Sequence, residues 1–214
     1  MTSRWGIVLV FAVFLIAAPS AAQAPAPSAS SASGPGAEVE SNSLAQALRG
    51  EARVLYDIGR ASFRDGDVAA ALANFQRAYD QSSDPRLLWN MAACEASLKH
   101  WARAMMLVDR YVANGASLIS DRDREQANRF RTAAKRFVAT VQLDVAPGMT
   151  VTVDGQVVGT APLGGALYLD AGKRRVSFTK PGYRGIVRTE TVAGEAALTW
   201  SIPAERLHVR VLGR

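Results

Sequence analysis

The chain has 214 residues, of which 49% are hydrophobic and 21% are charged, so its composition is that of a folding protein rather than a disordered one. Its one cysteine excludes an intramolecular disulfide framework, and its two histidines leave little material for a metal or acid–base centre. The formal net charge is +6, but 21 of the 25 basic residues are arginines in an alanine-rich chain, so codon usage in a GC-rich genome accounts for part of the excess. The composition argues against an enzyme.

The chain begins with the three-part pattern of a secretory signal peptide. Arg4 precedes the uncharged apolar run 6–18, and Ser20-Ala21-Ala22 places small residues at a cleavage site. The run is short for a membrane-spanning helix, which needs about 20 residues. We therefore predict a signal peptide over 1–22, with retention as an anchor as the alternative. Export to the periplasm, the envelope or the outside argues against nucleic acid as the partner.

A linker follows the predicted signal peptide. Residues 23–43 are mostly alanine, proline, serine and glycine, with almost no large apolar side chain to bury. Such a stretch cannot offset the entropy that ordering costs, so we predict a disordered tether. The folded body begins at residue 44.

The first half of the body repeats itself with a helical period. Two copies of one pattern of small, aliphatic and aromatic residues are offset by 33 residues. The first copy contains Leu55, Ile58, Gly59, Gly66, Val68, Ala71, Phe75 and Ala78, and the second Leu88, Met91, Ala92, Lys99, Trp101, Ala104, Val108 and Tyr111. A period of this length predicts paired antiparallel helices that stack on their neighbours.

Position by position, the pattern resembles the tetratricopeptide repeat (TPR). Gly59 stands where two helices approach closely, Val68 and Trp101 open the second helices, and Asp67 is the expected N-cap. We predict a TPR-like domain over 44–137, made of two repeats and a charged capping helix that begins at Asp121. The acidic residues at the start of that helix are interleaved with arginines, which favours a salt-bridged helix start over a cation site.

The resemblance implies a peptide-binding groove on the inner face of the first helix of each repeat. Arginines beside aromatic rings suit an acidic or C-terminal peptide. The residues expected on this face are Arg53, Tyr56, Arg60, Arg86, Trp89 and Asn90. The alternative is that two repeats only form a stable platform.

After Phe137 the apolar pattern alternates, which predicts strands. Strand signals lie at 140–145, 150–153, 156–158, 166–169, 174–180, 186–192 and 197–202, and Asp154-Gly155 forms a hairpin turn. Short strands with regular turns indicate a small antiparallel β-sandwich or barrel.

The turn motifs of this half resemble the PEGA domain in residues and in order. The motifs are Val153-Asp154-Gly155, Gly159-Thr160-Ala161-Pro162, Ala171-Gly172-Lys173 and Lys180-Pro181-Gly182-Tyr183, with Pro147-Gly148 as a degraded form of the eponymous motif. We place the domain at 138–205, followed by a tail over 206–214. The order of modules resembles exported TPR–PEGA proteins common in myxobacteria, and PEGA domains are thought to contact envelope polysaccharide.

A basic cluster on the predicted PEGA domain is the second candidate surface. Its members are Lys173, Arg174, Arg175, Lys180, Tyr183 and Arg184. The cations suit acidic glycans or lipid headgroups; a solvated strand end is the competing interpretation.

No motif predicts catalysis. Ser177 and Lys180 match a serine–x–x–lysine pattern, but that chemistry needs both residues on one helix face and here they fall on a predicted strand. Cys94 is expected to be a buried structural thiol. We predict no catalytic residue, metal or cofactor.

The sequence thus predicts a non-catalytic envelope adaptor, whose helical groove binds a protein or peptide and whose β domain contacts envelope material. A glycan-binding protein with the repeats as spacer, or a self-assembling subunit of a complex, are the alternatives.

Overall fold

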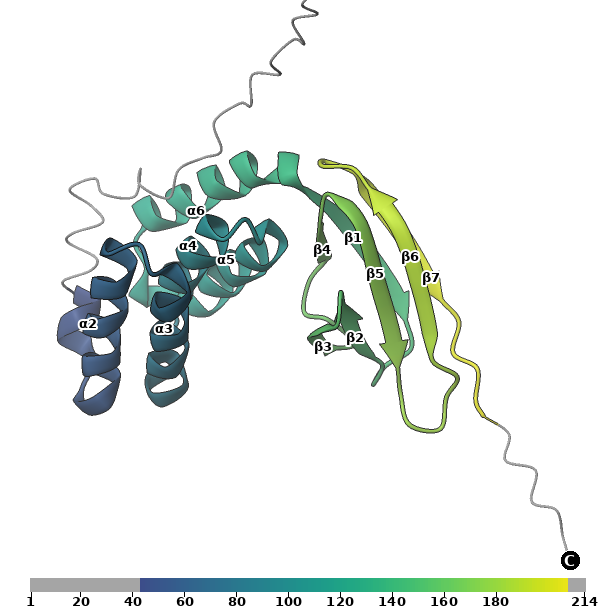
Figure 1. The fold of residues 1–214 in the computed structure, drawn as a ribbon, viewed down its shortest axis with the longest axis horizontal. Coiled ribbons are helices and arrows are strands. Elements are labelled where there is room, and N and C mark those ends of the chain that lie inside the picture. Colours follow the sequence, from purple (N-terminus) through teal and green to yellow (C-terminus); the bar gives the residue numbers. More distant parts are fainter. Residues whose placement is uncertain (1–42, 208–214) are drawn as a thin grey trace, which may run out of the picture.

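The structure is a computed structural model and describes residues 43–207. The predicted signal peptide and nearly all of the predicted linker lie outside these residues. The described part has two lobes, a helical lobe followed by a β lobe (Figure 1). The elements of the helical lobe are α2 (Gly50–Arg64), α3 (Val68–Ser82), α4 (Leu87–Ser97), α5 (Trp101–Gly115), the 3-10 turn η2 (Ala116–Leu118), α6 (Asp121–Ala134) and the 3-10 turn η3 (Lys135–Phe137).

The helical lobe consists of two helical hairpins and a last helix. The second helices α3 and α5 begin at Val68 and Trp101, which confirms the predicted offset of 33 residues. Asp67 caps α3, since its Oδ1 accepts the N–H of Ala70 at 3.0 Å. A methyl group at Gly59 would lie 2.8 Å from the ring of Phe75, so the close approach of α2 and α3 requires glycine there.

The last helix, α6, begins with a capping box rather than a cation site. The N–H of Asp123 donates to the Oγ of Ser120, and the N–H of Ser120 donates to the carboxylate of Asp123 at 2.8 Å. Ala127 and Ala134 are fully buried and Phe130 is half-buried, so one face packs on the hairpins while the other carries charge, as predicted for a terminal helix.

The β lobe contains two sheets. Its strands are β1 (Val138–Val145), β2 (Thr150–Val153), β3 (Gln156–Thr160), β4 (Leu167–Asp170), β5 (Gly172–Thr179), β6 (Ile186–Val192) and β7 (Ala197–Ile202). They pair in the orders β4-β1-β7 and β3-β2-β5-β6. The two sheets pack around Val151, Val176, Phe178, Leu167 and Trp200, which are all buried.

The prediction of a purely antiparallel β domain was wrong in one pairing. β1 and β7 run parallel, with Thr140 opposite Ala197 and Val145 opposite Ile202. β7 follows β5 and β6, which belong to the other sheet, and it returns to lie beside β1 in the same direction. The seven predicted strand positions are confirmed.

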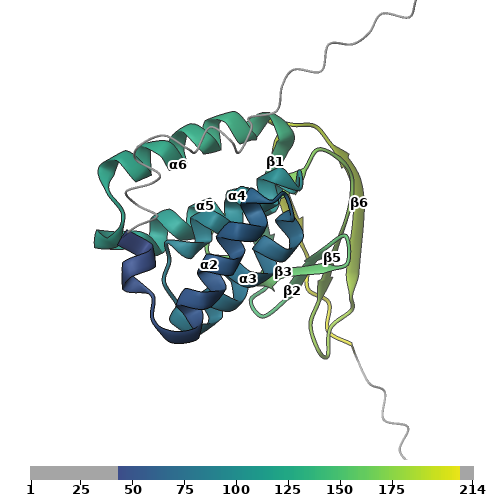
Figure 2. The ribbon, with the colours of Figure 1, turned by 60° about the vertical axis from the view of Figure 1, so that its left-hand side comes forward.

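The two lobes share a buried junction. The chain passes from the helical lobe directly into β1 (Figure 2). The rings of Trp101 and Phe137 stack there with their centroids 4.5 Å apart. Tyr168 of β4 donates its hydroxyl to the Oδ2 of Asp109 at 2.8 Å, and the N–H of Ala102 donates to Oδ1 of Asp170 at 2.8 Å. A residue of the β lobe therefore caps α5. These contacts fix how the two lobes sit relative to one another.

Candidate functional site

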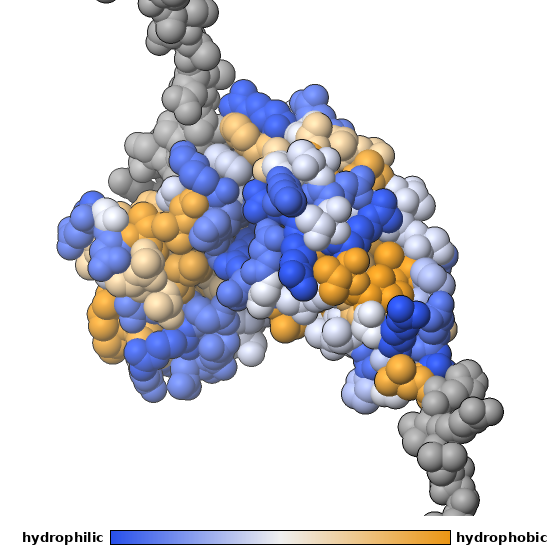
Figure 3. Space-filling model, turned by 45° about the vertical axis from the view of Figure 1, so that its right-hand side comes forward, coloured by the Kyte–Doolittle hydropathy of each residue, from blue (hydrophilic) through white to orange (hydrophobic). Residues whose placement is uncertain are grey.

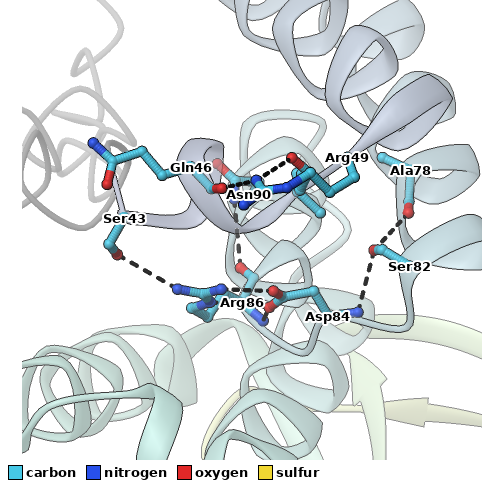
Figure 4. A network of polar contacts seen from close by, with 9 residues as sticks. Ser43, Gln46, Arg49, Ala78, Ser82, Asp84, Arg86 and Asn90 are labelled. Carbon is cyan, nitrogen blue, oxygen red and sulfur yellow. Dashed lines mark hydrogen bonds and ion pairs between the residues drawn. The ribbon is translucent and has the colours of Figure 1, made fainter.

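The six residues predicted to form the peptide groove lie on α2 and at the start of α4, where the chain's own residues 43–48 cover much of the surface. Residues 43–47 are helical, and Leu44, Ala45 and Leu48 are at most 5% exposed. Ser43, assigned by the sequence to the end of the linker, belongs to this helical segment (Figure 4). The surface that a peptide would occupy is in part filled by the protein itself.

Arg86 is a structural link rather than an open cation. Its Nε and Nη2 donate to the two oxygens of Asp84 at 3.0 and 2.7 Å, and its Nη1 lies 3.5 Å from the hydroxyl of Ser43 (Figure 4). The side chains of Arg86 and Asp84 are 10% and 13% exposed. The ion pair lies within the α3–α4 turn, and the contact of Arg86 with Ser43 joins this turn to the segment 43–48.

Two further polar residues of the predicted groove, Arg53 and Asn90, also make internal contacts. Arg53 donates to the carbonyl of Ala45 and pairs with Asp57 at 2.8 Å. The amide of Asn90 donates to the carbonyl of Arg86 at 3.4 Å. Both side chains are partly buried and their polar groups bond within the helical lobe.

The aromatic residues of the predicted groove belong to the core. Tyr56 is 1% exposed and its ring lies 5.9 Å from that of Phe75, with Arg60 above its other side at 5.7 Å. Trp89 packs between Tyr111 and Phe130, with ring centroids 5.6 and 6.1 Å away. Five of the six predicted residues therefore make contacts within the helical lobe, whereas Arg60 is exposed and lies over the ring of Tyr56.

An open cleft lies on the other side of the helical lobe. It has a volume of about 850 Å³ and separates α3, α4 and α5 from the β2–β3 hairpin and β4. Figure 3 shows the two lobes side by side with an indentation between them at the lower edge. The helical wall is apolar at Leu72, Met106 and Leu107, and the β wall is apolar at Val157 and Val158. No pattern in the sequence indicates this cleft, because it arises from the way the junction orients the two lobes.

Charged groups flank the cleft. The carboxylate of Glu95, 8% exposed, lies 2.7 Å from Nδ1 of His100 and 3.8 Å from Nη1 of Arg103. On the β side Asp154 pairs with Arg174 at 3.0 Å. Burial raises the pKa of Asp154, but the N–H of Arg175 and the guanidinium of Arg174 outweigh it, so that pKa is lowered overall.

Arg110 differs from the other cations of the cleft. Its guanidinium contacts Tyr79, whose hydroxyl oxygen lies 3.3 Å from Nη2 and whose ring centroid lies 5.7 Å from the guanidinium carbon. No ion pair joins Arg110 to a carboxylate within residues 43–207. Arg110 is exposed, so its charge is accessible at the edge of the cleft.

The predicted basic cluster of the β lobe divides into two groups. Lys173 and Arg175 are exposed on β5, whereas Arg174 is half-buried and turned toward Asp154. Beyond the end of β5, Lys180 donates to the carbonyl of Pro147 at 2.7 Å and lies 4.8 Å from the centroid of the Tyr183 ring. Arg184 is 3.5 Å from Glu205.

Lys173 and Arg175 belong to a face that the register of the strands reveals. Thr191 and Thr189 of β6 stand opposite them, and the outward positions continue through hydroxyl-bearing residues of β5 and β2: Ser177, Thr179, Thr152 and Thr150. The inward positions of these strands, Val151, Val176 and Phe178, are buried. The outer face of this sheet is thus hydroxyl-rich and cationic, and the signal in the sequence was three pairs of Thr or Ser two residues apart.

The side chains that could be chemically reactive have structural surroundings. Burial, followed by the charge of Glu95, raises the pKa of the Cys94 thiol to about 12. Ser177 lies within β5 and Lys180 beyond its end, so the serine–x–x–lysine match does not lie on a helix. Over residues 43–207, no group of three His, Cys, Asp or Glu residues comes together as a metal site. In the same part of the chain, no helix is long and apolar enough to cross a membrane.

The described fold is therefore a helical-hairpin lobe joined through a buried junction to a two-sheet β lobe with a binding-sized cleft between them. Residues 144–206 of the β lobe match the PEGA domain family, so the chain carries a PEGA domain. PEGA domains are typical of extracellular and periplasmic proteins, which supports an extracellular or envelope-associated role. Among curated proteins no match to the chain was found.

Proposed function

We propose that this protein is an exported, non-catalytic adaptor of the cell envelope. In this proposal the TPR-like helical lobe, together with the cleft, holds a protein partner, and the PEGA domain contacts envelope material. The observation that carries the proposal is the fixed junction between two different lobes with an open cleft beside it. Such an arrangement presents two surfaces in a constant relative position, which is what an adaptor needs.

The site proposed for the protein partner is the cleft rather than the inner groove predicted from the sequence. Residues 44, 45 and 48 pack against the inner face of α2 and α4, and the polar groups of Arg53, Arg86 and Asn90 are engaged internally. The cleft, in contrast, combines apolar walls with exposed charge, which is typical of binding sites.

The outer face of the β2-β5-β6 sheet supports contact with an acidic envelope polymer. Lys173 and Arg175 supply positive charge, and the threonine and serine hydroxyls around them supply hydrogen-bond donors and acceptors. No acidic residue takes an outward position between Lys173 and Thr179 of β5 or at their partners on β2 and β6.

The experiment compares the whole exported chain, residues 23–214, with the double variant Lys173→Glu and Arg175→Glu. Each is incubated with purified cell-wall and outer-membrane fractions and scored by co-sedimentation. We expect wild type to sediment, the variant to lose binding at least fivefold, and high salt to weaken the wild type because ions screen exposed charges.

The matched control reverses two exposed arginines of the helical lobe, Arg64→Glu and Arg122→Glu, and changes the net charge equally. If both double variants lose binding equally, the contact depends on the net charge of the protein alone. The outer face of the β2-β5-β6 sheet would then not be the binding surface. If wild type does not sediment, the envelope contact is wrong and a soluble subunit of an assembly becomes the better account.

A further inference from the structure

The cleft contains an open strand edge. Over residues 43–207, β3 pairs with β2 alone and ends its sheet. An edge strand presents unpaired backbone N–H and C=O groups that can accept another strand. β3 faces the helical lobe across the cleft, since Gln156, Val157 and Val158 line it.

β3 lacks the side chains that usually block such an edge. Its sequence, Gln156-Val157-Val158-Gly159-Thr160, contains no charge and no proline. The opposite edge strand of the same sheet, β6, carries Arg188 and Glu190. The register shifts between β2 and β3 so that Val158 is an extra residue, which restricts regular pairing to a short segment.

The space beside this edge suits an apolar, extended occupant. Val157 is 70% exposed, the highest value among the large hydrophobic residues that the structure describes as exposed. Across the cleft lie Leu72 of α3 and Met106 of α5. A strand laid along β3 would place alternate side chains against this helical wall and the others toward solvent.

The positive charge of Arg110 at the rim of the cleft favours apolar segments that also carry an acidic residue. Arg110 is exposed at the rim of the cleft, where its guanidinium contacts Tyr79 and forms no ion pair within residues 43–207. Arg103, in contrast, lies 3.8 Å from the carboxylate of Glu95, which His100 approaches to 2.7 Å. An acidic side chain next to the apolar positions of the occupant would pair with Arg110.

We propose that the cleft binds an extended segment of a protein partner, with alternating apolar residues and an acidic residue, which adds as a short strand to the open edge of β3. This inference deepens the adaptor function proposed above by naming the class of partner. Recognition by strand addition takes its affinity from main-chain hydrogen bonds and its specificity from pockets for alternate side chains.

The test uses a phage-displayed library of random octapeptides, selected on the exported chain, residues 23–214. We expect enriched peptides with apolar residues at alternate positions and at least one acidic residue. For a synthetic peptide of the enriched sequence, Val157→Lys should weaken binding at least tenfold and Arg110→Glu at least fivefold. Proline in the centre of the peptide should abolish binding, because it removes a backbone donor.

Val187→Lys is the matched control. Val187 is 53% exposed on β6, the other edge strand of the sheet, and its replacement should leave peptide binding unchanged. The proposal is overturned if no peptide is enriched, if the enriched peptides bind Val157→Lys as wild type, or if they tolerate the central proline. The wild type is also examined by sedimentation velocity. If it self-associates and Val157→Lys abolishes the association, the occupant of the cleft is a second copy of this chain, and the proposal of a different partner protein is wrong. These results do not depend on the envelope contact, which the co-sedimentation experiment tests separately.

Discussion

The helical lobe has two faces, and the face that looks suited to binding in the sequence is not the one that borders the cleft in the folded protein. The inner face carries arginines and aromatic rings, yet the polar groups of Arg53, Arg86 and Asn90 bond to the chain itself, and the buried residues of the segment 43–48 pack against this face. The face toward the β lobe is poorer in such residues, but its apolar side chains and Arg110 border an open cleft. The comparison teaches that residue type marks a binding surface only where the side chains have not already found partners within the fold.

The strongest test of the closed face removes Arg86. Arg86→Ala leaves the carboxylate of Asp84 nearly buried without its cation, and we expect the free energy of unfolding to fall by about 3 to 5 kcal/mol in urea denaturation. Arg110→Ala, on the open face, should cost less than about 1 kcal/mol. Similar losses in the two variants would erase the distinction between the faces.

A second test asks whether the segment 43–48 is part of the core. Leu48 is 4% exposed, so Leu48→Ala should reduce stability by about 2 to 4 kcal/mol. Leu207→Ala serves as control, because Leu207 is 59% exposed and its truncation should change stability by less than about 0.5 kcal/mol. If Leu48→Ala behaves like this control, the segment does not close the inner face in solution.

The smallest expected effect concerns the junction that holds the cleft open. Tyr168→Phe removes the hydrogen bond to Asp109 and should cost about 1 to 2 kcal/mol at pH 7. Burial, followed by this bond and the charge of Asp109, raises the pKa of Tyr168 from 10.0 to about 12. Its contribution is therefore fully present below pH 10 and lost as the pH rises through 12.

The alkaline measurement is made by urea denaturation between pH 8 and 12. Cys94→Ala is introduced into both proteins, because the pKa of that thiol is also raised to about 12. The variant with phenylalanine should lose less stability over this range than the one with tyrosine. Parallel curves would show that the hydroxyl does not join the lobes.

Much of the fold followed from local patterns. The offset of 33 residues located both hairpins because each repeat must bury the same close contacts, as Gly59 against Phe75 shows. Alternation and turn residues located every strand, and β2, β6 and β7 begin and end at the predicted residues. The parallel pairing of β1 and β7 was missed because it joins strands more than fifty residues apart, and no local pattern encodes their direction.

The candidate site was less accessible to sequence reasoning. The outer β face was foreseeable from the strand positions, since the exposed Lys173 and Arg175 alternate with the half-buried Arg174 and the buried Val176. The closing of the inner face depends on Ser43 meeting Arg86, 43 residues later, and the cleft depends on how Trp101 and Phe137 orient the lobes. Contacts between residues so far apart in the sequence leave no local pattern and are seen only in the folded structure.

The cap that Asp170 provides for α5 has a mechanical consequence. A helix normally finds its N-terminal acceptor in the residues just before it, whereas α5 finds one in β4, 68 residues further along the chain. The first turn of α5 therefore depends on the docking of β4, and pulling the two lobes apart would remove its cap. Separation of the lobes would thus expose an unsatisfied backbone N–H at the start of a helix in the other lobe.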